Sequence, residues 1–154
     1  EFQARIQEDS KASSRHGTAL IVSSALLIGG SYLIHAQDPV QVGAISLIRT
    51  VGILGIGEGA EGVWVSDQNR IFQQAMDRAT GLSLEAKSQV LRTYLELQAE
   101  QERKRNTIKA VTYSLVAAVN IYEGSRQGDD TVRTGLYFLG AVGLLRALTL
   151  SIDF

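Results

Sequence analysis

Residues 18–36 read TALIVSSALLIGGSYLIHA, nineteen consecutive positions without a formal charge when His35 is neutral. A helix needs about 20 apolar residues to cross a bilayer core of about 30 Å, and this segment meets that standard. After Thr18, the only polar side chains in its first half are Ser23 and Ser24. A helix here would have no charged face, whereas a surface helix of a soluble bundle normally has one. The segment therefore predicts a membrane span.

Three further apolar segments follow along the chain, at residues 40–56, 110–122 and 132–152. An arginine at the bilayer centre costs at least about 2.5 kcal/mol, so the segments that hold Arg49 and Arg146 span a membrane only if these charges are shielded. The segment at 110–122 is short, and Ile108 with the stem of Lys109 would extend it. The alternative to a membrane protein is a soluble helical bundle with very apolar helices.

Turn-forming residues join these segments in pairs. Gln37, Asp38 and Pro39 separate the first two segments, and residues 124–130 separate the last two. Links this short predict antiparallel helical hairpins. We therefore predict an all-α fold, a four-helix membrane bundle made of two helical hairpins linked by a polar helical insert. The expected parts are a polar helical tail (1–17), a first apolar hairpin (18–65), the insert (66–107) and a second apolar hairpin (108–154).

The two hairpins share a pattern that indicates either duplication or chance alignment of apolar segments. Ser24 and Tyr32 recur ninety positions later as Ser114 and Tyr122. Pseudo-symmetric repeats are common in membrane bundles, including many with no role in transport. Duplication of one hairpin is therefore a hypothesis, and chance alignment of two apolar segments is its alternative.

The polar insert predicts a small helical hairpin of its own. Ile71, Phe72, Ala75 and Met76 recur at helical spacing and form one apolar stripe. Residues 80–82 should form a turn, with Gly81 ending the first helix. The next helix should begin after the N-cap residue Ser83 and run unbroken to Tyr122, with Leu84, Leu91, Tyr94 and Leu95 facing the stripe.

The composition excludes several classes of site. The 154 residues contain no cysteine, which excludes disulfides, thiolate metal sites and cysteine nucleophiles. His16 and His35 are the only histidines and lie far apart, so we expect no metal site. With 15 basic and 16 acidic residues, no basic field indicates a nucleic-acid partner. No enzyme motif is present, and the pattern Gly57-x-Gly59-x-x-Gly62 follows no strand, so we expect neither an enzyme nor a cofactor.

Glycines recur at helix-packing spacing in the second and fourth apolar segments. Gly55 and Gly59 form a GxxxG pair, which permits close approach of membrane helices. A glycine in a helix costs about 1 kcal/mol relative to alanine, so repeated glycines indicate a packing role. The predicted packing glycines are Gly52, Gly55, Gly59, Gly140 and Gly143.

Four polar residues within or beside the apolar segments are candidates for an intramembrane role: Arg49, Glu58, Asn120 and Arg146. Charges at membrane depth need partners. Arg49 and Glu58 are nine positions apart, too far to pair on one helix, so we expect partners on other helices or chains. We favour structural ion pairs or snorkelling towards the interface, with a polar pathway for ions or protons as the alternative.

Basic residues are distributed unevenly between the two sides that four crossings would create. The tail and the insert, together with Lys109 just after the insert, carry eleven lysines and arginines, whereas the opposite side carries only Arg126 and Arg133. The positive-inside rule predicts an integral protein of the bacterial inner membrane with tail and insert in the cytoplasm. The chain begins Glu1-Phe2 without methionine, which leaves export after signal-peptide cleavage as the alternative.

These features favour a small structural membrane protein that packs through glycine-rich helices as a subunit of a homo-oligomer or of a larger envelope complex. Its expected partners are membrane lipid and other subunits. The first alternative is a channel or transport subunit for ions or small solutes. The second alternative is a soluble helical adaptor with an apolar core.

Overall fold

The computed structural model describes residues 2–65, 72, 75–77 and 81–152, and this part of the chain is helical with no β-strand. The long helices are α1 (Phe2–Ser31), α2 (Pro39–Trp64), α4 (Leu84–Ser125) and α5 (Asp130–Ile152). The prediction of an all-α chain is therefore confirmed.

Local capping residues set where these helices begin. The carboxylate of Asp38 accepts a hydrogen bond from the Gln41 N–H at 2.8 Å, and Pro39 occupies the first turn of α2, where its missing N–H costs nothing. Asp129 caps α5 in the same way, because its carboxylate accepts the Val132 N–H at 2.9 Å. The turn-forming residues identified in the sequence thus start both helices.

The first apolar segment is less helical than its sequence indicates. Helix α1 ends at Ser31, just after Gly29 and Gly30, and the N–H groups of Tyr32 and Leu33 bond back to these two glycine carbonyls. Only 14 residues of the segment, 18 to 31, are helical, which gives about 21 Å at 1.5 Å per residue. That is short of a bilayer core, and α1 is not among the described helices that are long and apolar enough to cross a membrane, so a full span over residues 18–36 stays a prediction.

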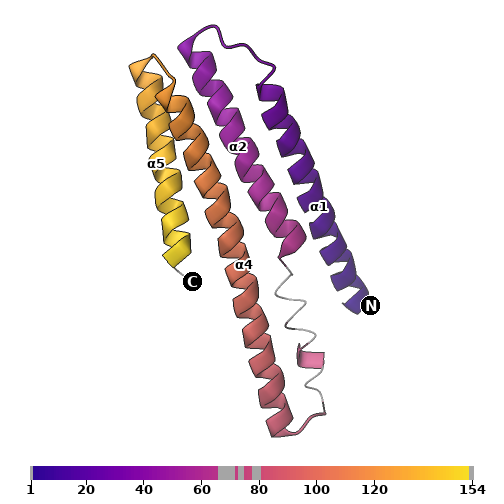
Figure 1. Cartoon of the computed structure of the whole chain (residues 1–154). Helices are drawn as coiled ribbons and strands as arrows, with labels where there is room; N and C mark the ends of the chain where they lie inside the picture. The colour runs from indigo at the N-terminus through magenta and orange to yellow at the C-terminus, as the bar shows by residue number, and fades with distance from the viewer. Residues whose placement is uncertain (1, 66–71, 73–74, 78–80, 153–154) are drawn as a thin grey trace.

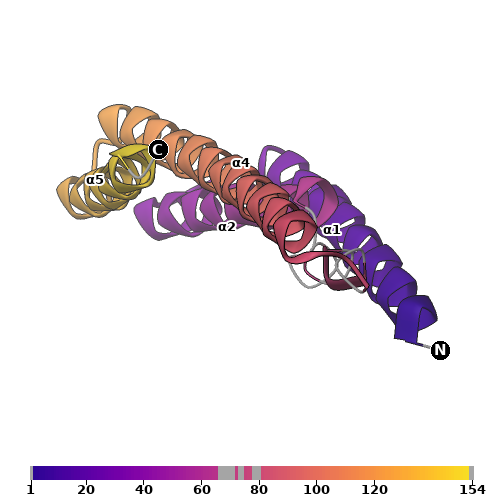
Figure 2. The ribbon, with the colours of Figure 1, turned by 90° about the horizontal axis from the view of Figure 1, so that it is seen from below.

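The helices form two antiparallel pairs, which contact each other mainly through one helix of each pair. Helix α1 packs on α2, α5 packs on α4, and α2 lies against α4 between them (Figure 1). A smaller contact joins α2 to α5, and no comparable contact joins α1 to α5. The main contacts therefore run in an open row from α1 through α2 and α4 to α5, and in the view from below α1 and α5 lie at opposite sides of the molecule (Figure 2). The predicted four-helix bundle is therefore not confirmed, and the hypothesis of duplicated hairpins stays a prediction.

Helix α4 is one continuous rod of 42 residues, about 63 Å long, and it extends well beyond α5 (Figure 1). Ser83 is its N-cap, with its hydroxyl accepting the Ala86 N–H at 3.4 Å. Gly81 has φ +82°, the left-handed conformation expected of a glycine in this turn. The predicted start and unbroken course of this helix are confirmed.

The apolar stripe of the insert lies partly outside the described residues, which include Phe72, Ala75 and Met76 but not Ile71. Phe72 packs edge-on against Tyr94 of α4, with ring centroids 5.6 Å apart, as the sequence predicts. Burial is smaller than expected, because Phe72, Met76 and Leu91 each remain about half exposed. The predicted course of the first insert helix over residues 67–79 falls largely outside the described part.

Within the part of the chain that the structure describes, two helices, α2 and α5, are long and apolar enough to cross a membrane. Only 28% of the apolar window of each is buried within the chain. A core helix of a soluble protein can be equally apolar, but it is mostly covered by its neighbours. Here the open row of helices leaves much of both apolar faces uncovered.

Candidate functional site

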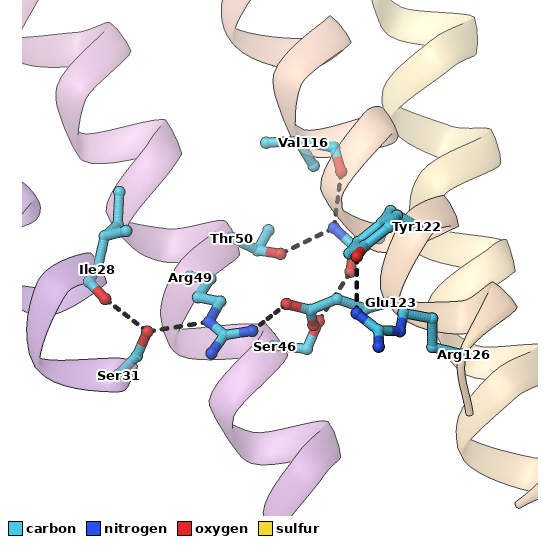
Figure 3. Close-up of polar contacts among 10 residues, drawn as sticks. Ile28, Ser31, Ser46, Arg49, Thr50, Val116, Tyr122, Glu123 and Arg126 are labelled. Carbon is cyan, nitrogen blue, oxygen red and sulfur yellow. Dashed lines mark hydrogen bonds and ion pairs between the residues drawn. The ribbon is translucent and has the colours of Figure 1, made fainter. Parts of the chain in front are cut away.

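A cluster of polar side chains lies where the two helix pairs meet, between α2, α4 and the end of α1 (Figure 3). Small side chains let α2 and α4 approach here. Ser46 and Thr50 lie one turn apart on α2, and they face Asn120 one turn before Glu123 on α4. Ser46 and Asn120 are fully buried, so the cluster belongs to the interior of the molecule.

The charged part of the cluster is an ion pair between Arg49 and Glu123. Their side chains are only 17% and 13% exposed. The Arg49 Nε also donates to the Ser31 hydroxyl at 3.0 Å, and its guanidinium lies 4.0 Å from the centre of the Tyr32 ring. Three helical segments therefore meet at one arginine. An unpaired Arg49 charge would cost free energy in this largely buried position, and the ion pair with Glu123 reduces that cost.

The neutral part of the cluster is centred on Asn120. Its amide nitrogen donates to the Thr50 hydroxyl at 2.9 Å and to the Val116 carbonyl at 2.8 Å. Its amide oxygen accepts from the Ser46 hydroxyl at 3.4 Å. Buried polar groups need such partners, because an unmade hydrogen bond in the interior costs about 1–3 kcal/mol. The network joins α2 to α4 by two hydrogen bonds in the interior of the molecule.

The polar groups of this cluster are paired with one another. Each of its charged and amide groups has a partner, and the cluster contains no histidine or serine–base pair that would activate a nucleophile. Among the residues that the structure describes, no group of three histidine, aspartate or glutamate side chains is arranged to hold a metal ion.

The glycines of α2 lie against α1. A Cβ atom on Gly52 would come within 2.5 Å of the Ile28 side chain, and one on Gly55 would collide with Ser24. A Cβ atom on Gly59 would lie 2.5 Å from the carbonyl oxygen of Gly17. These glycines allow the two backbones to approach more closely than any side chain would permit.

The glycines of α5 lie against α4 in the same manner. A Cβ atom on Gly140 would lie 2.6 Å from the Ile121 side chain, and one on Gly143 would lie 3.0 Å from the Tyr113 carbonyl oxygen. Between the pairs, Gly57 of α2 faces Thr112 of α4 with no room for a methyl group. All five predicted packing glycines therefore face a neighbouring helix of the same chain.

The other predicted polar candidates lie outside the cluster. Glu58 is exposed on α2, and Arg146 is exposed on α5. No salt bridge involves either of them within the described part of the chain. Glu61 forms a second charged contact between α2 and α4, with Arg105 at 3.8 Å and Lys109 at 3.7 Å.

Several members of the cluster were not among the sequence candidates: Ser31, Ser46, Thr50 and Glu123. In an apolar helix, serine and threonine are as typical of small packing residues as of a polar network. Glu123 lies at the end of an apolar segment, where a carboxylate can reach water and costs little free energy. The available signal was spacing, since Ser46 and Thr50 share one face of α2 with the same periodicity as the packing glycines.

Comparison with known proteins gives no match, since no family model, curated protein or solved structure is significantly similar to the chain.

Proposed function

We propose that the chain is a structural membrane subunit, whose helices pack through glycine-rich faces and present uncovered apolar faces to lipid and to neighbouring subunits. The observation that carries this proposal is the exposure of the two candidate spans. Only 28% of each apolar window is covered by the rest of the chain. Large side chains lie exposed on both helices, including Leu47 and Val51 of α2 and Phe138 and Leu145 of α5.

Exposed apolar area of this extent needs a cover. Soluble monomers rarely expose contiguous apolar patches larger than a few hundred Å². A bilayer provides such a cover along the full length of α2 and α5, and another subunit would cover the same faces in an assembly. The glycine contacts face inward, between helices of one chain, so they support the fold of the subunit, and the outward faces are left for association.

The orientation follows from the two ends of the molecule. The loops at 32–38 and 126–129 lie at one end, whereas the beginnings of α1 and α4 and the ends of α2 and α5 lie towards the other (Figure 1). We infer that the second end, which includes most of the basic residues, is cytoplasmic in a bacterial inner membrane. Basic side chains such as Arg105 and Lys109 would then lie on the cytoplasmic side.

Carbonate extraction of membranes from expressing cells tests the proposal. We expect the full chain to stay in the membrane pellet, and its release into the supernatant would contradict membrane integration and favour the soluble adaptor. The native chain has no cysteine, so single cysteines can report sidedness. In intact spheroplasts, an impermeant maleimide should label Gln127→Cys at the loop end and leave Glu102→Cys unlabelled. The reverse pattern would contradict the orientation.

A transport subunit is the second candidate, and the Arg49–Glu123 pair between the two hairpins is the observation in its favour. Purified chain in liposomes separates the two functions. A structural subunit gives no ion flux above that of protein-free liposomes. Flux that depends on Arg49, lost in Arg49→Ala while the protein stays in the membrane, would favour transport.

A further inference from the structure

A cavity of about 510 Å³ lies at the loop end of the molecule, where the two helix pairs meet. Its walls come from both pairs. The apolar part includes Ile34 and Val42 from the first pair and Val119 from α4. The polar part includes the Arg49–Glu123 pair and Arg126, which follows the last turn of α4 (Figure 3).

The charges that line this cavity do not balance. Arg49 is neutralised by Glu123. Arg126 has no carboxylate partner in the described part of the chain, and its guanidinium instead donates to the Tyr122 hydroxyl at 2.7 Å. The three charged groups therefore sum to +1. Arg126 is also exposed, so its remaining N–H donors are free to meet a ligand.

The aromatic residues of the cavity indicate its depth in a bilayer. Tyr32 and Tyr122 both line it, and each lies beneath an arginine, at 4.0 Å from Arg49 and 5.5 Å from Arg126. Tyrosine and arginine concentrate where the apolar core meets the head groups. The cavity thus combines one uncompensated cation at the interface with apolar walls.

We propose that this cavity binds the head group of an anionic phospholipid, with its phosphate on Arg126 and the start of an acyl chain along Val42 and Val119. The inference rests on the proposed membrane function. A phosphate matches the guanidinium, which can bind it through two parallel hydrogen bonds. The net charge of the site favours an anionic lipid over a zwitterionic one. A free anion would satisfy the arginine but would leave the apolar walls uncovered.

Native mass spectrometry of the full chain in detergent tests this proposal by counting bound lipid. The probes are dioleoyl phosphatidylglycerol, the matching phosphatidylcholine, and glycerol 3-phosphate as the free anion. The variant is Arg126→Gln. The control is Arg133→Gln. Arg133 lies half-exposed at the same loop end of the molecule, but it pairs with Asp130 and does not line the cavity.

We expect wild-type protein to bind phosphatidylglycerol about fivefold more tightly than phosphatidylcholine, the factor that one basic residue contributes near a membrane surface. Arg126→Gln should abolish this preference, and Arg133→Gln should keep it. The proposal is overturned if wild type shows no preference, or if the two variants behave alike. It is also overturned if glycerol 3-phosphate binds as tightly as the lipid, because the site is then one for a free anion.

Carbonate extraction of the same variants separates this inference from the proposed function. Retention in the membrane without lipid preference overturns only the lipid site. Release of the wild-type chain from the membrane overturns both.

Discussion

Replacing Gly59 with alanine tests whether the close contact between α1 and α2 stabilises the chain. The added Cβ would lie 2.5 Å from the Gly17 carbonyl oxygen and 2.8 Å from the Ile21 side chain. An ordinary carbon–oxygen contact is about 3.3–3.6 Å, so the helices must separate by about 1 Å. The atom that blocks the methyl group belongs to backbone, which cannot rotate away as a flexible side chain would.

Two opposing terms set the magnitude. Overpacking a well-fitted contact costs about 1–3 kcal/mol. Alanine in place of glycine returns up to about 1 kcal/mol through helix propensity. Because both the Gly17 backbone and the Ile21 side chain resist the methyl group, we expect a packing cost in the upper part of its range, about 2–3 kcal/mol. After the gain in helix propensity, the net loss in the free energy of unfolding is about 1–2 kcal/mol.

The matched control is Gly135→Ala in α5, where an added Cβ has no atom within 4 Å. This variant should gain up to about 1 kcal/mol from helix propensity alone. Unfolding of the purified chain in mixed micelles, followed by circular dichroism as the fraction of SDS rises, measures both. If Gly59→Ala is stabilised as much as Gly135→Ala, the contact between α1 and α2 is not as close as the structure indicates.

Removing one charge of the buried pair should destabilise more than removing both. Arg49→Met leaves Glu123 without its partner and should cost about 2–3 kcal/mol, whereas adding Glu123→Leu should recover most of that loss in the same unfolding assay; a double variant no better than the single one would contradict this. Asn120→Ala should cost about 1–3 kcal/mol by unfolding, because the buried Ser46 and Thr50 hydroxyl groups lose their partner; an unchanged midpoint would show that water replaces the amide. The hydrogen bond and charge of Lys104 lower the pKa of Glu100, so Lys104→Gln should raise that pKa towards its usual value in an NMR titration. Since the folded-state pKa is lowered, the small stabilisation exists at neutral pH and disappears as the pH falls through that pKa.

Local sequence rules were sufficient for the course of single helices. Asp38 with Pro39, Asp129 and Ser83 each start a helix, because capping depends on residues within one turn of each other. The continuity of α4 followed from the absence of any proline or glycine between Ser83 and Gly124. The early end of α1 also had a local signal, the pair Gly29 and Gly30. The apolar character of residues 18–36 nevertheless led to the prediction of a longer helix.

Only the tertiary structure decided which residues meet. The spacing of the glycines predicts close packing, but the partner of Gly59 is Gly17, a residue that no pattern in the sequence singled out. Arg49 needed a partner on another helix, and its pairing with Glu123 depends on the rotation and register of α2 against α4. Two helices can pack in many registers with similar apolar burial, so contacts between residues 74 positions apart are set by the sum of many interhelical contacts and not by any local pattern.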